Sequence, residues 1–283
     1  MIRRSARWLA PVHAALDGLA EGPVPWFFRD DDAGWADSQL WALADVFGAA
    51  GVALDVAAIP AALSSGTAER LSRLATGGAV RVYQHGWSHV NHEMTGRRCE
   101  FGRGRSAEQQ LADLVTGRAH LAGQLDGRVE PVFVPPWNRC ADLTLALLTD
   151  LGFAGLSRDA SGPRCHEAGP GERPPWNPRL GEVGVCIDWV RLWREGGPVL
   201  LGGALAAAVT DSERAGCGGA LGVMLHHAAH GPDDLQALRH LLAVIHDHPA
   251  VRVSPLAALV SQARLRSPHA AVPAASEPAR RMA

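Results

Sequence analysis

The chain contains no lysine, so arginine carries every fixed positive charge on its side chains. Its 27 basic residues are balanced by 29 acidic ones, and the formal net charge is −2. There is no long basic patch that could neutralise a phosphate backbone. The sequence therefore does not indicate a nucleic-acid partner.

Cysteine is also scarce, with five residues in the whole chain. The number is odd and no two cysteines form a Cys-x-x-Cys pair, which argues against a disulfide framework and against a structural zinc site. Several free thiols are therefore expected, and free thiols favour the cytoplasm. The cysteines are Cys99, Cys140, Cys165, Cys186 and Cys217.

Long apolar runs are missing as well. None reaches the roughly 18 residues that a membrane-spanning helix needs. The N-terminus has the basic start of a signal peptide, but Pro11 and His13 interrupt an apolar segment that is already too short. We therefore expect a cytoplasmic protein with no membrane partner.

Tyrosine occurs once, whereas tryptophan occurs nine times. Indole rings stack on the apolar faces of sugars, so the excess suits a carbohydrate pocket; a plain core role is an equally good interpretation for most of them. Hydrophobic residues make up 47% of the 283 positions. That is enough for one large α/β domain with a substantial core.

The most informative segment present is Tyr83-Gln-His-Gly-Trp-Ser-His89. His85 and His89 are four residues apart, and an Asp triplet at 30–32 lies upstream. Two imidazoles and one carboxylate are the ligand set of an open catalytic zinc site, in which water takes the fourth position. Such a metal suits hydrolysis because it activates water and polarises a carbonyl. The alternative is a chance histidine pair and a solvated Asp turn.

Three further segments place polar groups where apolar strands end. They are Phe133-Val-Pro-Pro-Trp-Asn-Arg139, Val185-Cys-Ile-Asp-Trp-Val190 and Leu221-Gly-Val-Met-Leu-His-His227. Catalytic groups of α/β folds collect at the C-terminal ends of strands. A lone carboxylate such as Asp188 inside an apolar strand is costly unless it has a partner. Each segment is weak evidence by itself, and their order along the chain is more specific.

In that order the segments resemble the motifs of the polysaccharide deacetylase family, the NodB-homology group that includes carbohydrate esterase family 4. The matching stretches are Arg29-Asp-Asp-Asp32, His85-Gly-Trp-Ser-His89, Val134-Pro-Pro-Trp137, Ile187-Asp-Trp189 and Leu225-His226. The resemblance spans about residues 24–258. It implies an α/β fold, a distorted (β/α)7 barrel, and a divalent metal, Zn²⁺ or alternatively Co²⁺.

The resemblance also assigns roles at the metal. Asp32, His85 and His89 match the ligands, and Asp31 matches the general base. The triplet leaves the register open, because Asp30 as base with Asp31 as ligand is the alternative. We favour the first register because the pattern Arg-x-Asp-Asp-x-Gly then places a glycine at the turn.

At the other end of the motif series, His226 matches the general acid, and Asp188 matches the carboxylate that orients a catalytic imidazole. His227 is the alternative acid. A second metal cluster of His226, His227 and His230 is disfavoured, because neighbouring residues on a strand face opposite sides.

The substrate pocket is expected to be lined by Pro136, Trp137, Asn138, Arg139 and Trp189. The chain departs from the family pattern at Val134, where members usually carry an arginine that pairs with the catalytic base. Arg139 and Arg29 are the two candidates to replace it. If neither does, the base lacks a partner that lowers its pKa.

We predict an N-terminal extension at 1–23, a catalytic domain at 24–262 and a disordered tail at 263–283. Alternating strands and helices predict a parallel barrel. Strands are expected at 24–29, 52–59, 79–84, 129–134, 153–156, 183–190, 221–225 and 251–253, and helices at 38–50, 67–75, 106–125, 143–151 and 232–246. The Gly- and Pro-rich stretch 157–179 is expected to form a loop over the site.

The resulting prediction is a metal-dependent hydrolase that removes an acetyl group from an N- or O-acetylated sugar or a related small molecule. Family members that act on cell-wall polymers are usually exported, so a cytoplasmic location favours a small or precursor substrate. One alternative is a catalytically silent carbohydrate-binding relative. Another is a hydrolase of a non-acetyl C–N bond on the same fold.

Overall fold

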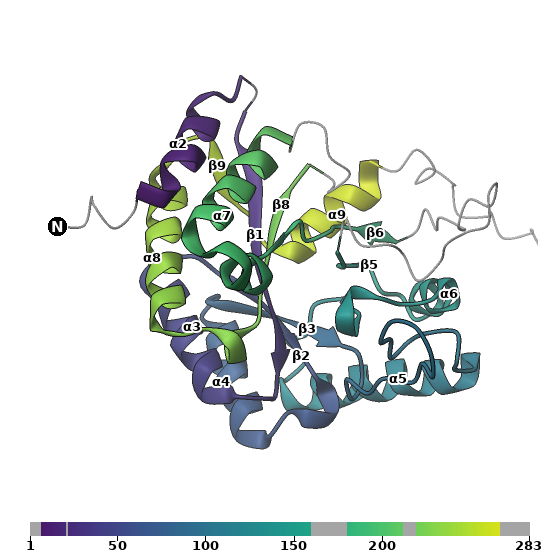
Figure 1. Cartoon of the computed structure of the whole chain (residues 1–283). Coiled ribbons are helices and arrows are strands. Elements are labelled where there is room, and N and C mark those ends of the chain that lie inside the picture. The colour runs from purple at the N-terminus through teal and green to yellow at the C-terminus, as the bar shows by residue number, and fades with distance from the viewer. Residues whose placement is uncertain (1–6, 21, 160–179, 212–218, 267–283) are drawn as a thin grey trace, which may run out of the picture.

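The computed structural model describes residues 7–20, 22–159, 180–211 and 219–266 (Figure 1). These residues form a parallel nine-stranded sheet, in which the strand order is β6-β5-β4-β3-β2-β1-β8-β7 and β9 pairs with β1 beside this path. The strands are β1 (Val24–Ala33), β2 (Leu54–Ala58), β3 (Val80–His85), β4 (Val132–Val134), β5 (Gly155–Leu156), β6 (Gly181–Glu182), β7 (Ile187–Asp188), β8 (Leu221–Leu225) and β9 (Val251–Val253). The predicted distorted barrel is confirmed.

Helices follow most strands, and most of them pack on the outside of the curled sheet (Figure 1). They are α2 (Ala10–Asp17), α3 (Asp37–Ala49), α4 (Ser65–Thr76), α5 (Ala107–Gln124), α6 (Asp142–Asp150), α7 (Trp189–Asp211), α8 (Pro232–Asp247) and α9 (Leu256–Arg266). The sequence reasoning locates α3, α4, α5, α6 and α8 and misses the other three. In the described part of the chain, every helix is too short or too polar to span a lipid bilayer.

The strand predicted at 183–190 is shorter and interrupted in the structure. Ile187 and Asp188 form β7, Val185 makes an isolated bridge with Asp159, and α7 begins at Trp189. The helix begins there because an Asp188 carboxylate oxygen accepts the Arg191 backbone N–H at 3.0 Å, which satisfies one of the unpaired donors of the first turn. Gly197, with φ 60°, and Pro198 interrupt α7 and hide its helical periodicity in the sequence.

Strand β1 lies at the centre of the sheet, and its side chains alternate between two apolar layers. Trp26 and Phe28 face the outer layer under the helices, where Phe28 meets Phe47 of α3 edge to face at 5.2 Å. Phe27 faces the inner layer, which it shares with buried residues of α9. The next two residues on the inner face are Arg29 and Asp31, so this strand carries buried charge into the barrel.

Helix α9 closes the inside of the barrel at the end away from the motifs. Asp55 of β2 is the link: its Oδ1 accepts the Tyr83 hydroxyl at 2.7 Å, and its Oδ2 accepts the Leu256 N–H at 3.1 Å. Burial raises the pKa of Asp55 to about 7, an effect that the Tyr83 and Leu256 donors only partly offset. Since this end is filled, the opposite mouth, at the C-terminal ends of the strands, is left for a site.

The chain outside 24–262 is only partly described. The predicted N-terminal extension contains α2, which packs on α7, and Trp8 meets Trp189 edge to face at 6.3 Å. Helix α9 ends at Arg266, four residues into the predicted tail. Residues 160–179 of the predicted loop and 267–283 of the predicted tail lie outside the described residues.

Candidate metal centre and active site

A cavity of about 680 Å³ opens at the C-terminal ends of the strands. It brings together three residues that the sequence assigns to the site, namely Asp32 from β1, Asp188 from β7 and His226 after β8. The first turns of α7 form its far wall. The full lining is Asp32, Asp188, Val190, Arg191, Arg194, Glu195, His226, Ala228 and Ala229.

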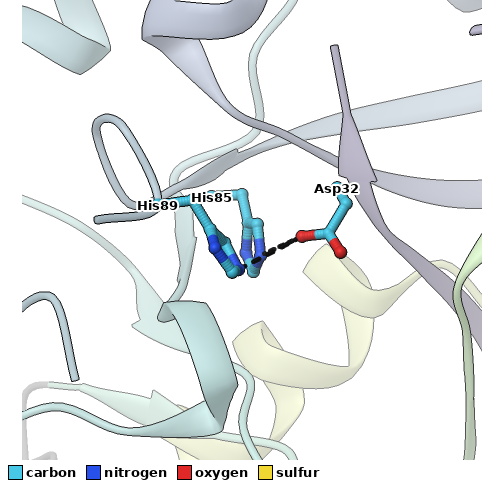
Figure 2. Close-up of side chains that lie close together, drawn as sticks. All are labelled: Asp32, His85 and His89. Atoms are coloured by element: carbon cyan, nitrogen blue, oxygen red, sulfur yellow. Dashed lines mark ion pairs between the residues drawn. The ribbon is translucent and has the colours of Figure 1, made fainter. Parts of the chain in front are cut away.

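Asp32, His85 and His89 converge beside this cavity (Figure 2). The Nε2 atoms of His85 and His89 each lie 3.2 Å from Oδ1 of Asp32. One ligand atom from each residue lies within 4.8 Å of the other two. Among the described residues these three form the one group of His, Cys, Asp or Glu side chains with this geometry. They are the three residues predicted as metal ligands.

The donor atoms of this group fit a divalent metal. His85 Nδ1 donates to the Val134 carbonyl oxygen at 3.0 Å, which leaves the Nε2 lone pair directed at Asp32. This second contact is the usual device for fixing the tautomer of a metal-binding histidine. Asp32 Oδ1 is buried and makes no hydrogen bond, although two imidazole nitrogens are close to it. Two imidazole nitrogens and one carboxylate oxygen without a hydrogen bond form a donor set that suits zinc or a similar ion.

The charges of the group shift the pKa values of all three residues. Burial alone would raise the pKa of Asp32, but His85 and, more weakly, His226 and His89 lower it to about 2. Burial and the charge of His85 lower the pKa of His89. Burial would lower the pKa of His85 too, but Asp32 and Asp31 raise it. At neutral pH the Asp32 carboxylate is therefore ionised, and the lowered pKa of His89 favours its neutral, metal-binding form. The raised pKa of His85 favours a proton that metal binding would displace.

Backbone strain is concentrated around these residues. Of the six non-glycine residues with positive φ in the described chain, four belong to the site: Asp32, His89, Trp137 and Asn138. Such conformations cost about 1–3 kcal/mol each and persist only where the surroundings impose them. The positive φ of Asp32 breaks the alternation of β1 side chains between the two faces of the sheet, and the Asp32 carboxylate turns towards the histidines.

Arg29 supplies the partner that is missing at Val134. Its Nε and Nη2 donate to the two carboxylate oxygens of Asp31 at 2.8 and 2.9 Å, and its side chain is fully buried. The same guanidinium donates to Ser157 Oγ at 2.8 Å and to Asn138 Oδ1 at 2.6 Å. Arg139 instead donates to the Arg98 carbonyl. Of the two candidates, Arg29 is the one that pairs with Asp31.

Asp30 lies on the opposite face of β1 and is engaged elsewhere. Its carboxylate accepts the His227 backbone N–H at 2.9 Å and His227 Nδ1 at 2.7 Å. His227 Nε2 lies 2.7 Å from the Trp35 carbonyl oxygen. Both ring nitrogens therefore donate to oxygens, so the buried ring is an imidazolium. This geometry favours the Asp31/Asp32 register over the alternative that uses Asp30.

His226 and His227 point to opposite sides, as expected for neighbours at a strand end. His226 is half-buried and faces the cavity, whereas His227 is fully buried under the helices. Asp188 lines the same cavity while one of its oxygens caps α7. His226 as acid and Asp188 as its partner remain predictions, and His227 has no free N–H for that role.

The predicted pocket residues divide into three kinds. Trp137 packs on His89 with ring centroids 4.3 Å apart. Pro136 is buried, and Asn138 holds Arg29 and Met224, so both support the site from behind. Trp189 is not part of the pocket. It is fully buried in the core and stacks on Trp193, because α7 begins at this residue and turns its ring inward.

Trp35 and Glu100 are site residues that the sequence reasoning misses. The Trp35 ring meets His89 edge to face at 5.1 Å and is 43% exposed beside the cavity. Its signal in the sequence was its place three residues after the Asp triplet. Glu100 is fully buried and contacts the backbone that carries His89. It follows a Gly- and Arg-rich stretch with no local pattern to distinguish it.

No protein-family model matches the sequence, and no curated protein does. Solved structures do match the fold. A candidate polysaccharide deacetylase from Mycobacterium smegmatis has a TM-score of 0.60 and 16% identity, over 88% of this chain and 93% of that chain. The chain has the NodB-type fold of the polysaccharide deacetylases.

Two further structures share this NodB-type fold. The peptidoglycan deacetylase PdaC from Bacillus subtilis has a TM-score of 0.51 and 10% identity, over 84% of this chain and 90% of that chain. A family 4 carbohydrate esterase pseudoenzyme from Bacillus anthracis has a TM-score of 0.53 and 12% identity, over 84% of this chain and 66% of that chain. Identities this low establish the fold, and the activity has to be argued from the site.

Proposed function

We propose that this protein is a metal-dependent hydrolase that removes an acetyl group from an N- or O-acetylated sugar or a related small molecule. One observation carries the proposal: a buried carboxylate oxygen of Asp32, which makes no hydrogen bond, lies beside the imidazole nitrogens of His85 and His89. Asp31 adjoins this set in the chain, and His226 shares its cavity.

Asp31 acts as the general base and takes a proton from the attacking water. Arg29 holds both of its oxygens and so fixes the direction in which its remaining lone pairs point. A divalent metal held by the three ligands, zinc or cobalt, supplies Lewis acidity for the acyl carbonyl and for the water. His226 then gives a proton to the departing amine or alkoxide, which completes the acid–base pair that amide hydrolysis requires.

The aromatic rings around His89 support a carbohydrate substrate. Trp35 and Trp137 lie on this ligand, and Trp35 is well exposed. Indole faces match the apolar faces of sugar rings. A cavity of about 680 Å³ is within the range that holds a small ligand.

The pseudoenzyme from Bacillus anthracis is the observation that favours the second candidate, a silent binding relative. Here the three ligands, Asp31 and His226 are all present, and Arg29 occupies the place of the missing partner. A chain released from catalytic selection is free to lose such groups. A hydrolase of a non-acetyl C–N bond would use the same residues, so substrate tests must separate it.

The test is acetate release from a panel of N- and O-acetylated mono- and disaccharides by zinc- or cobalt-loaded protein. We expect release by the native chain that chelation abolishes and that His226→Ala reduces by about 100-fold. Sugar binding without acetate release by metal-loaded protein would instead establish the binding relative. Activity confined to non-acetyl amides would identify the third candidate.

A further inference from the structure

Glu100 binds the backbone of the segment that carries the second histidine ligand. It is fully buried in the connection between β3 and α5. Its Oε1 accepts the N–H of Ser88 at 2.7 Å and the N–H of His89 at 3.1 Å, and both of its oxygens lie 3.3 Å from the Trp87 nitrogen. The Ser88 hydroxyl donates to Oε1 at 3.2 Å. One carboxylate thus holds three consecutive residues.

Three successive N–H groups that point at one oxygen form a nest, a backbone shape that binds anions. Here the anion is a side chain of the same protein. The nest matters because His89 has φ 56°, which a non-glycine residue adopts only when its surroundings hold it there. Hydrogen bonds from Glu100 to residues 87–89 are the contacts that can supply this hold.

Gly86 shows how closely Glu100 is packed against the segment. The residue has φ 62°, and a Cβ atom placed there would collide with the Glu100 carboxylate and would lie 2.6 Å from Pro136 Cγ. Only glycine therefore fits between Glu100 and the Pro-Pro loop.

We propose that Glu100 is a positioning residue that holds His89 in its ligating orientation and, through this hold, tightens the binding of a divalent cation by the segment. The first part of the proposal, the hold on His89, concerns the metal-free chain. The second part, tighter binding of a divalent cation, rests on the proposed function. A carboxylate suits this place because it offers only acceptors, whereas an amide would turn an NH₂ group towards some of the N–H donors.

The test compares Glu100→Gln with a control in the same connection, Glu93→Gln. Glu93 Oε1 accepts the Gly104 N–H at 3.1 Å and so holds a different part of the loop. Amide hydrogen exchange of residues 87–89 is measured in metal-free protein. We expect exchange at least about 10-fold faster in Glu100→Gln, because local opening no longer breaks these bonds, and native-like exchange in the control.

Zinc affinity by competition with a chelator is the second readout. We expect roughly 10–100-fold weaker binding for Glu100→Gln and a change under about twofold for Glu93→Gln. Glu100→Asp keeps the carboxylate but draws it back by one methylene, so its zinc affinity and its exchange rates should lie between those of the native chain and those of Glu100→Gln. If Glu100→Gln does not fold, Glu100→Asp takes its place in both measurements.

Native-like exchange at residues 87–89 in either folded variant would overturn the proposal. Native-like zinc affinity in Glu100→Gln would overturn its second part. A native chain that takes up no zinc would contradict the proposed function and, with it, this second part. The exchange measurement on metal-free protein would still decide the first part.

Discussion

Asp30 and Asp31 are neighbours on one strand and are almost equally buried, at 0% and 2% exposure, yet they belong to different parts of the molecule. Asp30 faces the helical layer and pairs with His227. Asp31 faces the barrel interior and pairs with Arg29, beside the metal ligands. A step of one residue along β1 thus separates an ion pair under the helices from one at the site.

The partners explain the difference in use. Both ring nitrogens of His227 donate to protein oxygens, so the Asp30–His227 pair has no free N–H that could give a proton to a substrate. Arg29 engages one lone pair of each Asp31 oxygen and leaves the others available. We therefore expect loss of Asp30 to lower stability and loss of Asp31 to lower the reaction rate.

The largest effect is expected for Asp31→Asn. The amide cannot accept the proton from water, so kcat should fall by at least about 100-fold and up to about 10⁴-fold. Zinc content should stay near its native value. The free energy of unfolding should fall, because the buried Arg29 guanidinium loses its counter-charge, so kcat is taken per folded molecule. Acetate-release kinetics and metal analysis measure this, and a variant with more than half of the native kcat would remove Asp31 from the mechanism.

Asp30→Asn should lower the stability and leave the reaction rate nearly unchanged. Removing one charge of a buried pair leaves the His227 imidazolium without compensation and should lower the free energy of unfolding by about 3 kcal/mol. The rate per folded molecule should stay within a few-fold of native. Urea unfolding and kinetics on the same sample measure both quantities. A rate loss like that of Asp31→Asn, without destabilisation, would reverse the register.

The pH dependence of stability offers a finer test of the ion pair between Asp30 and His227. Burial alone would lower the pKa of His227, but the Asp30 carboxylate raises it from 6.5 to about 9. Because the folded pKa is the higher one, the pair contributes fully below pH 6.5, and its contribution disappears as the pH rises through about 9.

The contribution lost in that window is roughly 3 kcal/mol. It is measured as the difference in unfolding free energy between the native metal-free chain and His227→Gln, at about pH 6 and about pH 10. We expect the difference to shrink at the higher pH. A difference that stays constant or grows would show that the ring is not charged in the folded chain.

The smallest effect is expected for Trp35→Ala. Trp35 contacts both the ion pair under the helices and the candidate metal site. Its carbonyl accepts from His227, and its ring lies against His89. Trp35→Ala keeps the carbonyl and removes the ring. KM for an acetylated sugar should rise by roughly 5–10-fold, from a loss of about 1 kcal/mol of stacking, while the unfolding midpoint changes little. An unchanged KM would exclude the ring from substrate contact.

The sequence predicts that Asp32, His85 and His89 lie together, because they follow strand ends and parallel strands bring those ends to one edge. Their role as metal ligands stays a prediction. The faces of β1 were harder to assign. Phe27 and Phe28 are both fully buried, so hydrophobic alternation does not distinguish the barrel interior from the helical layer.

Two other features were missed for different reasons. The cap that Asp188 gives to α7 is local, but Gly197 and Pro198 hide the helix that follows it, and the start of this helix moves the Trp189 ring into the core. Glu100 contacts residues 87–89 across a loop, and its partners are backbone N–H groups, which any sequence supplies. Contacts between side chains and distant backbone therefore lie beyond pattern reasoning.

We propose that the inner face of the barrel mouth holds a metal through Asp32, His85 and His89. Metal analysis by mass spectrometry, on the purified native chain and on His89→Ala, is the most direct test of this metal site. We predict about one zinc or similar ion per native chain and a large loss in the variant. A native chain that carries no metal and takes none up on addition would contradict the claim.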